Sequence, residues 1–137
     1  MQISQPGEAW RPYNENYLLS NKGRWYSKRT KRILRDRINS SGYSRAKLTN
    51  QKHVFTHIKV VELFGDKNGK RLPKDGSLIK HGLSIDHVDG NKQNNAKTNL
   101  EIVLHRENCL RRSQRLKEGE RGENKCLQKA NYKKLTI

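Results

Sequence analysis

The sequence predicts an α+β fold in which a few short antiparallel strands precede a strand–loop–strand–helix unit. Residues 10–55 place aromatic and polar side chains between turn signals, which is typical of short strands. Residues 84–112 carry two short apolar runs separated by an Asn-rich loop, and then a polar helical pattern. Only 31% of the 137 residues are hydrophobic, so we expect one small domain, or a small core with extensions.

The net charge of +17 is unevenly distributed along the chain. Residues 1–55 hold 12 basic and 3 acidic residues, residues 56–108 hold 9 and 7, and residues 109–137 hold 9 and 3. A nearly balanced centre between basic flanks favours a polyanion bound by the flanks, and nucleic acid is the simplest such partner. The alternative is a basic surface that is only solvated.

The sequence disfavours a membrane, secreted or zinc-stabilised protein. No run approaches the roughly 18 apolar residues of a membrane span, and residues 1–10 lack a basic-then-apolar signal pattern. Cys109 and Cys126 form no CxxC pair, so no structural zinc site is indicated. Such sparse use of cysteine fits a cytoplasmic protein.

The first strands are expected around the turn signal Asn21-Lys22-Gly23, at residues 17–19 and 24–26. Their aromatic side chains favour a small core, and stacking on nucleic-acid bases is the alternative. Residues 27–38 are strongly basic and fit neither the helical nor the strand period, so their secondary structure stays open. Residues 43–48 predict a strand, residues 49–52 a turn, and Val54-Phe55 the start of a return strand.

Residues 56–64, THIKVVELF, predict a helix that Thr56 can cap. His57 is either a structural histidine of this helix or a phosphate contact. Residues 65–82 are rich in Gly, Lys and Asp and predict a long loop.

The central unit begins with a predicted strand at residues 83–88, which ends at the turn pair Asp89-Gly90. Residues 91–98 form a polar loop, and residues 99–104 predict the second strand. A basic helical pattern begins at His105 and is broken by Gly119. In this arrangement Asp89 is expected to form the turn rather than to serve as a second ligand of a cation.

The chemistry of this unit depends on Asp86, His87 and Asn108. Adjacent strand side chains point to opposite faces, so Asp86 and His87 can flank one cleft only if the strand ends or bends there. The second strand folds back and feeds the helix, which brings Asn108 beside Asp86. Carboxylate and amide oxygens suit Mg²⁺, and a neutral imidazole can accept a proton from water. An EF-hand calcium loop is excluded, because Gly90 at its sixth position would place Ile85 at the first.

Residues 86–108, DHVDGNKQNNAKTNLEIVLHREN, resemble the motif of HNH endonucleases, especially those of phages and intron homing enzymes. The resemblance implies a ββα-metal core, also called the His-Me finger. It also implies that Asp86 and Asn108 bind one divalent ion per site, Mg²⁺ or Mn²⁺. His87 would be the general base, and Asn99 would orient the site and tie down its loop. The products would carry 5′ phosphate and 3′ hydroxyl ends.

The upstream residues resemble the modular DNA-binding segment that often precedes such a core. The matching patterns are W-x-P-Y, N-Y-x-x-S-N-x-G-R, G-Y-x-x-x-x-L and T-H-x-x-x-x-x-L-F. Asn94 and Asn95 in turn match the Asn pair that braces the loop of the family. We therefore expect a basic β-rich DNA-binding segment at 1–55, a nuclease core with a leading helix at 56–117, and a basic tail at 118–137.

The predicted function is that of a metal-dependent HNH DNA endonuclease of the homing type, which nicks or cuts double-stranded DNA as a monomer or homodimer. The alternative is a non-catalytic nucleic-acid-binding module derived from such a nuclease. The residues expected to contact DNA are Arg24, Lys28, Arg29, Lys31, Arg32, Arg35, Arg37, Arg106, Arg111, Arg112 and Arg115.

Overall fold

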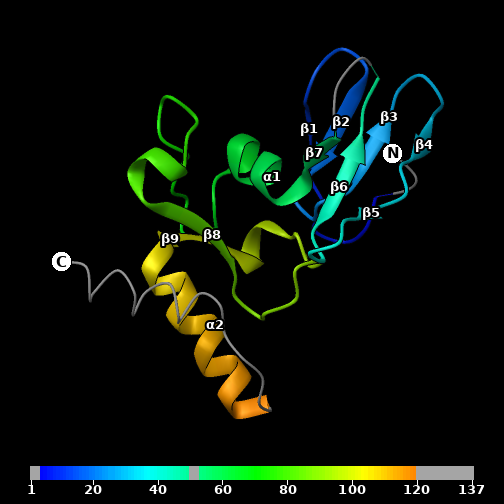
Figure 1. Ribbon diagram of the computed structural model, residues 1–137. Coiled ribbons are helices and arrows are strands. Elements are labelled where there is room, and N and C mark those ends of the chain that lie inside the picture. The colour runs from blue at the N-terminus through cyan, green and yellow to red at the C-terminus, as the bar shows by residue number, and fades with distance from the viewer. Residues whose placement is uncertain (1–3, 50–52, 120–137) are drawn as a thin grey trace.

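The computed structural model describes residues 4–49 and 53–119. Short antiparallel strands from the first half of the chain lie on one side of the molecule (Figure 1). The last two strands and the last helix lie on the other side, and helix α1 stands between the two groups. This is the α+β class that the sequence predicts.

The first sheet has four strands in the order β1-β2-β3-β4, each antiparallel to its neighbour. They are β1 (Trp10–Pro12), β2 (Tyr17–Ser20), β3 (Trp25–Ser27) and β4 (Arg32–Ile33). The predicted hairpin around residues 21–23 is therefore confirmed. The side chains of Tyr17 and Trp25 are buried, which confirms that the strand aromatics build a core.

The second sheet consists of β5 (Arg37–Ile38), β6 (Ser44–Lys47) and β7 (His53–Phe55), again antiparallel. It confirms the strand predicted at 43–48 and the return strand that follows. The turn predicted between them at 49–52 falls mostly on residues 50–52, which lie outside the described residues. The basic stretch 27–38, left open by the sequence, contains the two short strands β4 and β5 joined by exposed loops.

Helix α1 (Thr56–Phe64) confirms the helix predicted at these residues, but the predicted cap is wrong. The N-cap position is occupied by Phe55, and no side chain caps the helix. The hydroxyl of Thr56 instead accepts a hydrogen bond from the indole N–H of Trp25 at 3.0 Å, and both side chains are buried. A buried indole N–H requires an acceptor, and this need takes the hydroxyl away from the helix end.

The strand–loop–strand–helix unit is formed by β8 (Leu83–His87), β9 (Leu100–Leu104) and α2 (His105–Gly119). The two strands are antiparallel, with Leu83 opposite Leu104 and His87 opposite Leu100. Asn99 belongs to the 3₁₀ turn Lys97–Asn99, so β9 begins one residue later than predicted. The stretch 65–82 is a loop, as expected, with one 3₁₀ turn at Ile79–His81.

One hydrophobic cluster joins residues of both halves of the described chain. Tyr17, Leu19 and Trp25 of the first sheet belong to it together with Val60 of α1 and Leu100 of β9. The two halves are therefore held together by a shared core. The division at 55/56 stays a prediction, and most of the predicted tail 118–137 lies outside the described residues.

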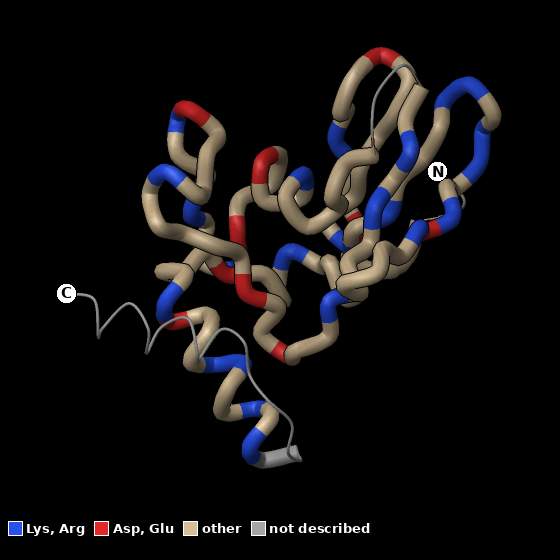
Figure 2. Tube along the Cα trace, in the orientation of Figure 1, with Lys and Arg blue, Asp and Glu red and all other residues tan. Residues whose placement is uncertain are grey.

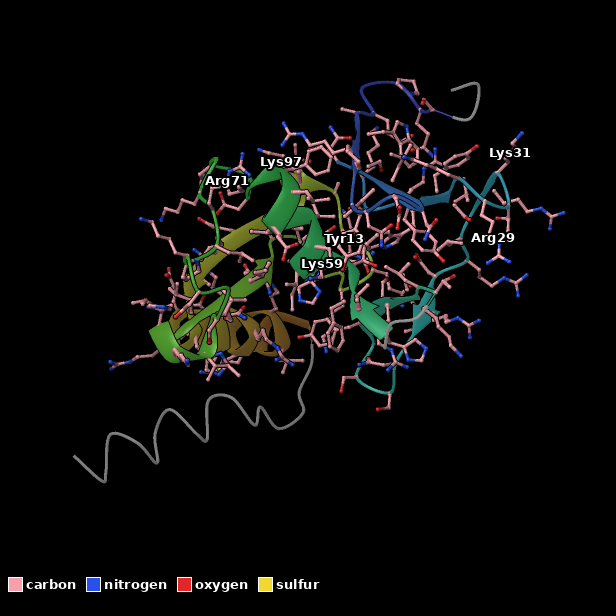
Figure 3. The ribbon with its side chains drawn as sticks, turned by 90° about the horizontal axis from the view of Figure 1, so that it is seen from above. Tyr13, Arg29, Lys31, Lys59, Arg71 and Lys97 are labelled. Carbon is pink, nitrogen blue, oxygen red and sulfur yellow. The ribbon has the colours of Figure 1, made fainter. Side chains whose placement is uncertain are left out.

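Lys and Arg residues are frequent along β3–β5, in the loop between α1 and β8 and along α2 (Figure 2). From above, Arg29 and Lys31 project from the end of the molecule that lies opposite Arg71 (Figure 3). The described residues contain no helix that is long and apolar enough to span a membrane.

Candidate active site

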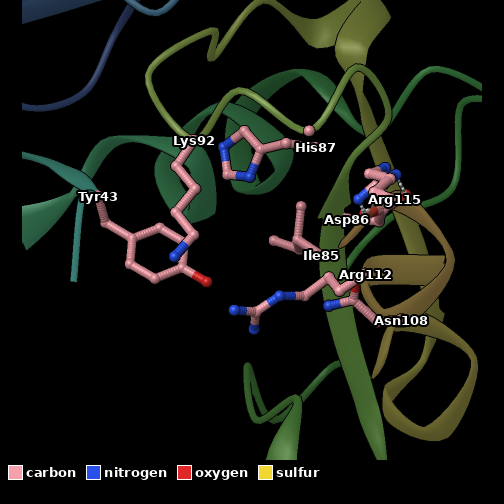
Figure 4. Close-up of a pocket in the computed structure, with 9 residues that line it drawn as sticks. Tyr43, Ile85, Asp86, His87, Lys92, Asn108, Arg112 and Arg115 are labelled. Atoms are coloured by element: carbon pink, nitrogen blue, oxygen red, sulfur yellow. Dashed lines mark hydrogen bonds and ion pairs between the residues drawn. The ribbon is translucent and has the colours of Figure 1, made fainter. Parts of the chain in front are cut away.

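A small pocket opens where β8 ends, between α2, the loop after β8 and the second sheet (Figure 4). It is lined by Tyr43, Ile85, Asp86, His87, Gly90, Lys92, Asn108, Arg112 and Arg115. Because β8 ends at His87 and the chain turns at Gly90, the adjacent side chains of Asp86 and His87 both reach it. The pocket thus brings together the three residues on which the predicted chemistry depends.

The imidazole of His87 is buried and held by one side chain. Its Nε2 lies 2.8 Å from Oδ1 of Asn95, whose amide nitrogen donates to the carbonyl of Gln93 at 3.5 Å. Oδ1 can only accept, so Nε2 carries the proton and the lone pair is on Nδ1. Burial lowers the pKa of His87 from its ordinary value, while the bond to Asn95 and the nearby Asp86 partly oppose this shift. His87 is therefore neutral at neutral pH, as a general base must be.

A second histidine packs against His87 from the side of α1. The ring centroids of His57 and His87 are 5.1 Å apart, and His57 also stacks on Tyr43 at 5.2 Å. Burial, together with the neighbouring His87, lowers the pKa of His57 to about 3, so this ring is also neutral. His57 does not line the pocket, which favours the structural interpretation of this residue.

The loop that follows β8 is closed by Asn99. Its Oδ1 accepts from the backbone N–H of Asp89 at 3.0 Å, and its Nδ2 donates to the Asp89 carboxylate and to the carbonyl of Asn94, both at 2.9 Å. Asp89 also accepts from the backbone N–H of Asn91 at 2.8 Å and therefore forms the turn, as expected. Asn99 is buried and is not among the pocket-lining residues, so it acts on the site through the loop.

Asn108 carries an acceptor that the protein itself leaves without a partner. Its Nδ2 donates to the hydroxyl of Ser84 at 2.9 Å, and this bond fixes the amide. Its Oδ1 is buried and has no hydrogen-bond partner within the described part of the chain. An unpaired buried acceptor costs about 1–3 kcal/mol, and this oxygen is therefore available to a further group.

Asp86 and Asn108 fit a hard divalent cation. They supply a carboxylate and an amide oxygen to the same pocket, and both are ligand types that Mg²⁺ accepts. Among residues 4–49 and 53–119, no group of three His, Cys, Asp or Glu side chains could hold a metal ion. The remaining ligands would be water and phosphate oxygens, which Mg²⁺ commonly keeps.

Two arginines of α2 occupy the Asp86 carboxylate, although the sequence assigned both to DNA. Arg111 lies 3.1 Å from Oδ2, and Arg115 lies 3.1 Å from Oδ2 and 3.3 Å from Oδ1. Only 2% of the Asp86 side chain is exposed, and a carboxylate so buried needs such partners.

The other basic residues that the sequence assigned to DNA fall into three groups. The guanidinium of Arg24 is held by Glu8 at 2.7 Å and lies over the ring of Trp10, and this hydrogen bond lowers the pKa of Glu8 to about 2. Arg112 lines the pocket. The remaining side chains are exposed and belong to Lys28, Arg29, Lys31, Arg32, Arg35, Arg37 and Arg106.

The sequence missed two residues that line the pocket, Tyr43 and Lys92, and one that orients a lining residue, Ser84. Tyr43 reaches it from the turn between β5 and β6. Lys92 lies 4.9 Å from the Tyr43 ring centroid and donates to the carbonyl of Ser41 at 2.9 Å. Ser84 orients Asn108 from two residues before Asp86. For Ser84 the sequence did offer one signal: it precedes Asp86 by two positions and so lies on the same face of the strand.

The comparisons with known proteins agree with the motif. Residues 54–110 match the family model described as HNH endonuclease. An uncharacterised HNH endonuclease of Acanthamoeba polyphaga mimivirus is 30% identical over 100 residues, covering 71% of this chain and 27% of that protein. The DNA endonuclease I-HmuI of Bacillus phage SP01 is 31% identical over 103 residues, covering 70% of this chain and 51% of the relative.

A solved structure of the HNH homing endonuclease I-HmuI, described for its DNA binding and cleavage, is also similar. It superposes with a TM-score of 0.59 at 26% identity, over 92% of this chain and 68% of that one. The fold class predicted from the sequence is thereby confirmed. The chain spans about a quarter and about half of the length of the two curated relatives. Residues 54–110 thus match the HNH endonuclease family, and the relatives named here are HNH or DNA endonucleases.

Proposed function

We propose that this protein is a metal-dependent endonuclease that hydrolyses phosphodiester bonds of double-stranded DNA. The observation that carries the proposal is the buried, unpartnered Oδ1 of Asn108 in the same pocket as Asp86 and His87. An unpaired acceptor, a carboxylate and a neutral imidazole are the groups that cation-assisted hydrolysis of a phosphodiester requires. The DNA endonuclease among the relatives supports DNA as the substrate.

In this proposal each side chain has a defined task. Nδ1 of His87 removes a proton from the attacking water, and Asn95 keeps the other nitrogen protonated throughout. Asp86 and Asn108 would hold Mg²⁺ or Mn²⁺, one ion per site. When bound, the cation offsets negative charge that develops on the phosphate oxygens. Asn99 keeps the loop closed around these groups.

The scissile phosphate would be held by the basic side of the pocket. Lys92 and Arg112 line it opposite Asp86, and the hydroxyl of Tyr43 faces the same space in Figure 4. An ammonium and a guanidinium are the usual phosphate-binding groups of proteins. The exposed basic residues of β3–β5 and α2 would hold the flanking DNA backbone.

One site cuts one strand, so a double-strand break needs two cleavage events or two chains. A monomer would release a nicked product, whereas a homodimer could cut both strands. Mapping the cut positions on both strands of a defined target distinguishes these outcomes.

The proposal is tested with supercoiled plasmid in Mg²⁺ or in EDTA. Wild-type protein is expected to nick the plasmid only with Mg²⁺, and His87→Ala is expected to lose nicking while still shifting the DNA in a gel. His81→Ala is the matched control, because His81 is exposed and pairs with Asp75 of the loop before β8. Equal nicking by wild type and His87→Ala would contradict the proposal. DNA binding by the wild type without cleavage would identify the non-catalytic module instead.

A further inference from the structure

Arg115 covers both oxygens of the carboxylate on which the proposed metal site depends. Its NH2 lies 3.1 Å from Oδ2 and 3.3 Å from Oδ1 of Asp86, and its NH1 lies 3.3 Å from Oδ1. The same NH2 also donates to the carbonyl of Val88 at 3.1 Å. A guanidinium placed in this way engages the lone pairs that a cation would need.

Arg111 is bound differently and is less free to change partner. One of its nitrogens reaches Oδ2 of Asp86 at 3.1 Å, but the same nitrogen lies 2.7 Å from Glu101 and the other lies 3.1 Å from Glu107. Glu101 is the main cause that raises the pKa of Arg111. If a divalent cation bound Asp86, Arg111 would still be paired with Glu101 and Glu107. Arg115 would retain only its hydrogen bond to the Val88 carbonyl among the contacts described above.

The loop beside Asp86 leaves room for the Arg115 side chain. Gly90 has a φ of 79°, and a Cβ at this position would lie 3.2 Å from Cδ of Arg115. Glycine therefore serves the turn and the passage of Arg115 at once. Arg115 also lines the pocket together with Lys92 and Arg112. The guanidinium of Arg115 could therefore bind a phosphate that enters the pocket in place of Asp86.

We propose that Arg115 is a displaceable counter-ion that competes with the divalent cation for Asp86 and makes cation binding weak in the DNA-free protein. A buried carboxylate cannot be left without a partner, so something must neutralise Asp86 before the cation arrives. Arg115 neutralises the Asp86 carboxylate, but it also occupies the oxygens that the cation would bind. The inference rests on the proposed role of Asp86 as a metal ligand.

The test is the affinity for Mn²⁺ without DNA, measured by titration calorimetry and by the electron paramagnetic resonance signal of free Mn²⁺. Arg115→Gln is expected to bind Mn²⁺ roughly tenfold more tightly than wild type, a change equivalent to about 1.4 kcal/mol. Arg111→Gln should gain less, because it covers one oxygen of Asp86 only. Arg106→Gln is the matched control: Arg106 is exposed on the same helix, and its removal should change the affinity by less than about twofold at about 0.15 M salt, where exposed charges are screened.

Two further variants locate the effect. Asp86→Asn in the Arg115→Gln background should abolish the gain, which places the ion at Asp86. Arg115→Lys keeps the charge but cannot span both oxygens of Asp86, so its gain in Mn²⁺ affinity is expected to be intermediate. This second variant tests the inference even if Arg115→Gln folds poorly.

The outcomes separate this inference from the proposed function. Mn²⁺ binding that depends on Asp86 but is no tighter in Arg115→Gln or Arg115→Lys overturns the inference and leaves the proposed function standing. An equal gain in Arg106→Gln overturns it as well, because it shows a general effect of charge. The absence of Asp86-dependent binding in every variant overturns both.

Discussion

At the scale of single residues, the structure shows how one hydrogen bond prepares His87 for its proposed task. The bond from Nε2 to Asn95 leaves the lone pair on Nδ1, and burial keeps the ring neutral. Ser84 does the corresponding work for Asn108 by binding its Nδ2 and leaving Oδ1 for another group. In both cases a neutral side chain outside the reaction decides which atom of a functional side chain is available.

We predict that Asn95→Ala lowers kcat for plasmid nicking by about 10- to 100-fold, the usual cost of removing a partner that orients a functional side chain. Without Oδ1, either nitrogen of His87 can carry the proton and the ring can turn. Gln93→Ala is the control, since Gln93 is exposed in the same loop. Single-turnover cleavage together with a DNA-binding assay measures the effect, and an unchanged rate in Asn95→Ala would contradict the assigned role.

At the scale of secondary structure elements, the turn between β2 and β3 supports the loop of the site. The backbone N–H of Lys97 donates to the carbonyl of Asn21 at 2.7 Å. Gly23 lies against Asn95 so closely that a Cβ at this position would be 2.7 Å from the Cβ of Asn95. The hairpin near the N-terminus therefore fixes the position of the residue that holds His87.

We predict that Gly23→Ala impairs cleavage more than it impairs folding. The φ of 82° at Gly23 makes any side chain strained, at about 1–2 kcal/mol, and the added methyl group also displaces Asn95. Gly69→Ala is a matched control, because Gly69 has a φ of 81° and no atom within 4 Å of the added methyl group. Both variants should unfold at a lower temperature, and only Gly23→Ala should lose cleavage. Equal activities at equal stability would show that the contact with Asn95 has no functional effect.

At the scale of the whole molecule, basic residues lie on several surfaces of the described chain, and carboxylates and arginines meet near the pocket. Exposed basic residues lie on β3–β5, in the loop between α1 and β8 and on α2, while Asp86, Glu101 and Glu107 gather around Arg111 of α2. Such surfaces attract a polyanion, and the pocket carries Lys92, Arg112 and Arg115 of the same charge sign.

We predict that replacing Lys28, Arg29 and Lys31 with Gln makes the dependence of DNA affinity on salt shallower. Each lost phosphate contact should reduce the slope of log K against log salt by roughly 0.9. The matched control replaces Lys70, Arg71 and Lys74 of the loop before β8, which removes the same charge at the opposite end of the molecule (Figure 3). Binding isotherms at several salt concentrations give both slopes. An unchanged slope in the first variant would mean that this loop does not touch DNA.

The sequence by itself determined the local elements and the motif. The hairpin around residues 21–23, the helix at 56–64 and the unit from β8 to α2 follow from turn signals and periodicity, which act over a few residues. Asp86, His87 and Asn108 could be named because they lie within one contiguous stretch, and the structure brings them to one pocket. The cap of α1 was wrong because Trp25, 31 positions away, claims the hydroxyl of Thr56.

Only the tertiary structure decided which partners these residues have. The pairing of Asp86 with Arg115, the contact of Gly23 with Asn95 and the approach of Tyr43 to the pocket all join parts of the chain that are distant in sequence. A long basic side chain can meet a phosphate or a carboxylate equally well, and its sequence neighbours do not distinguish the two. The choice is made by which charges the folded chain buries, since a buried carboxylate must find a counter-ion while an exposed one need not.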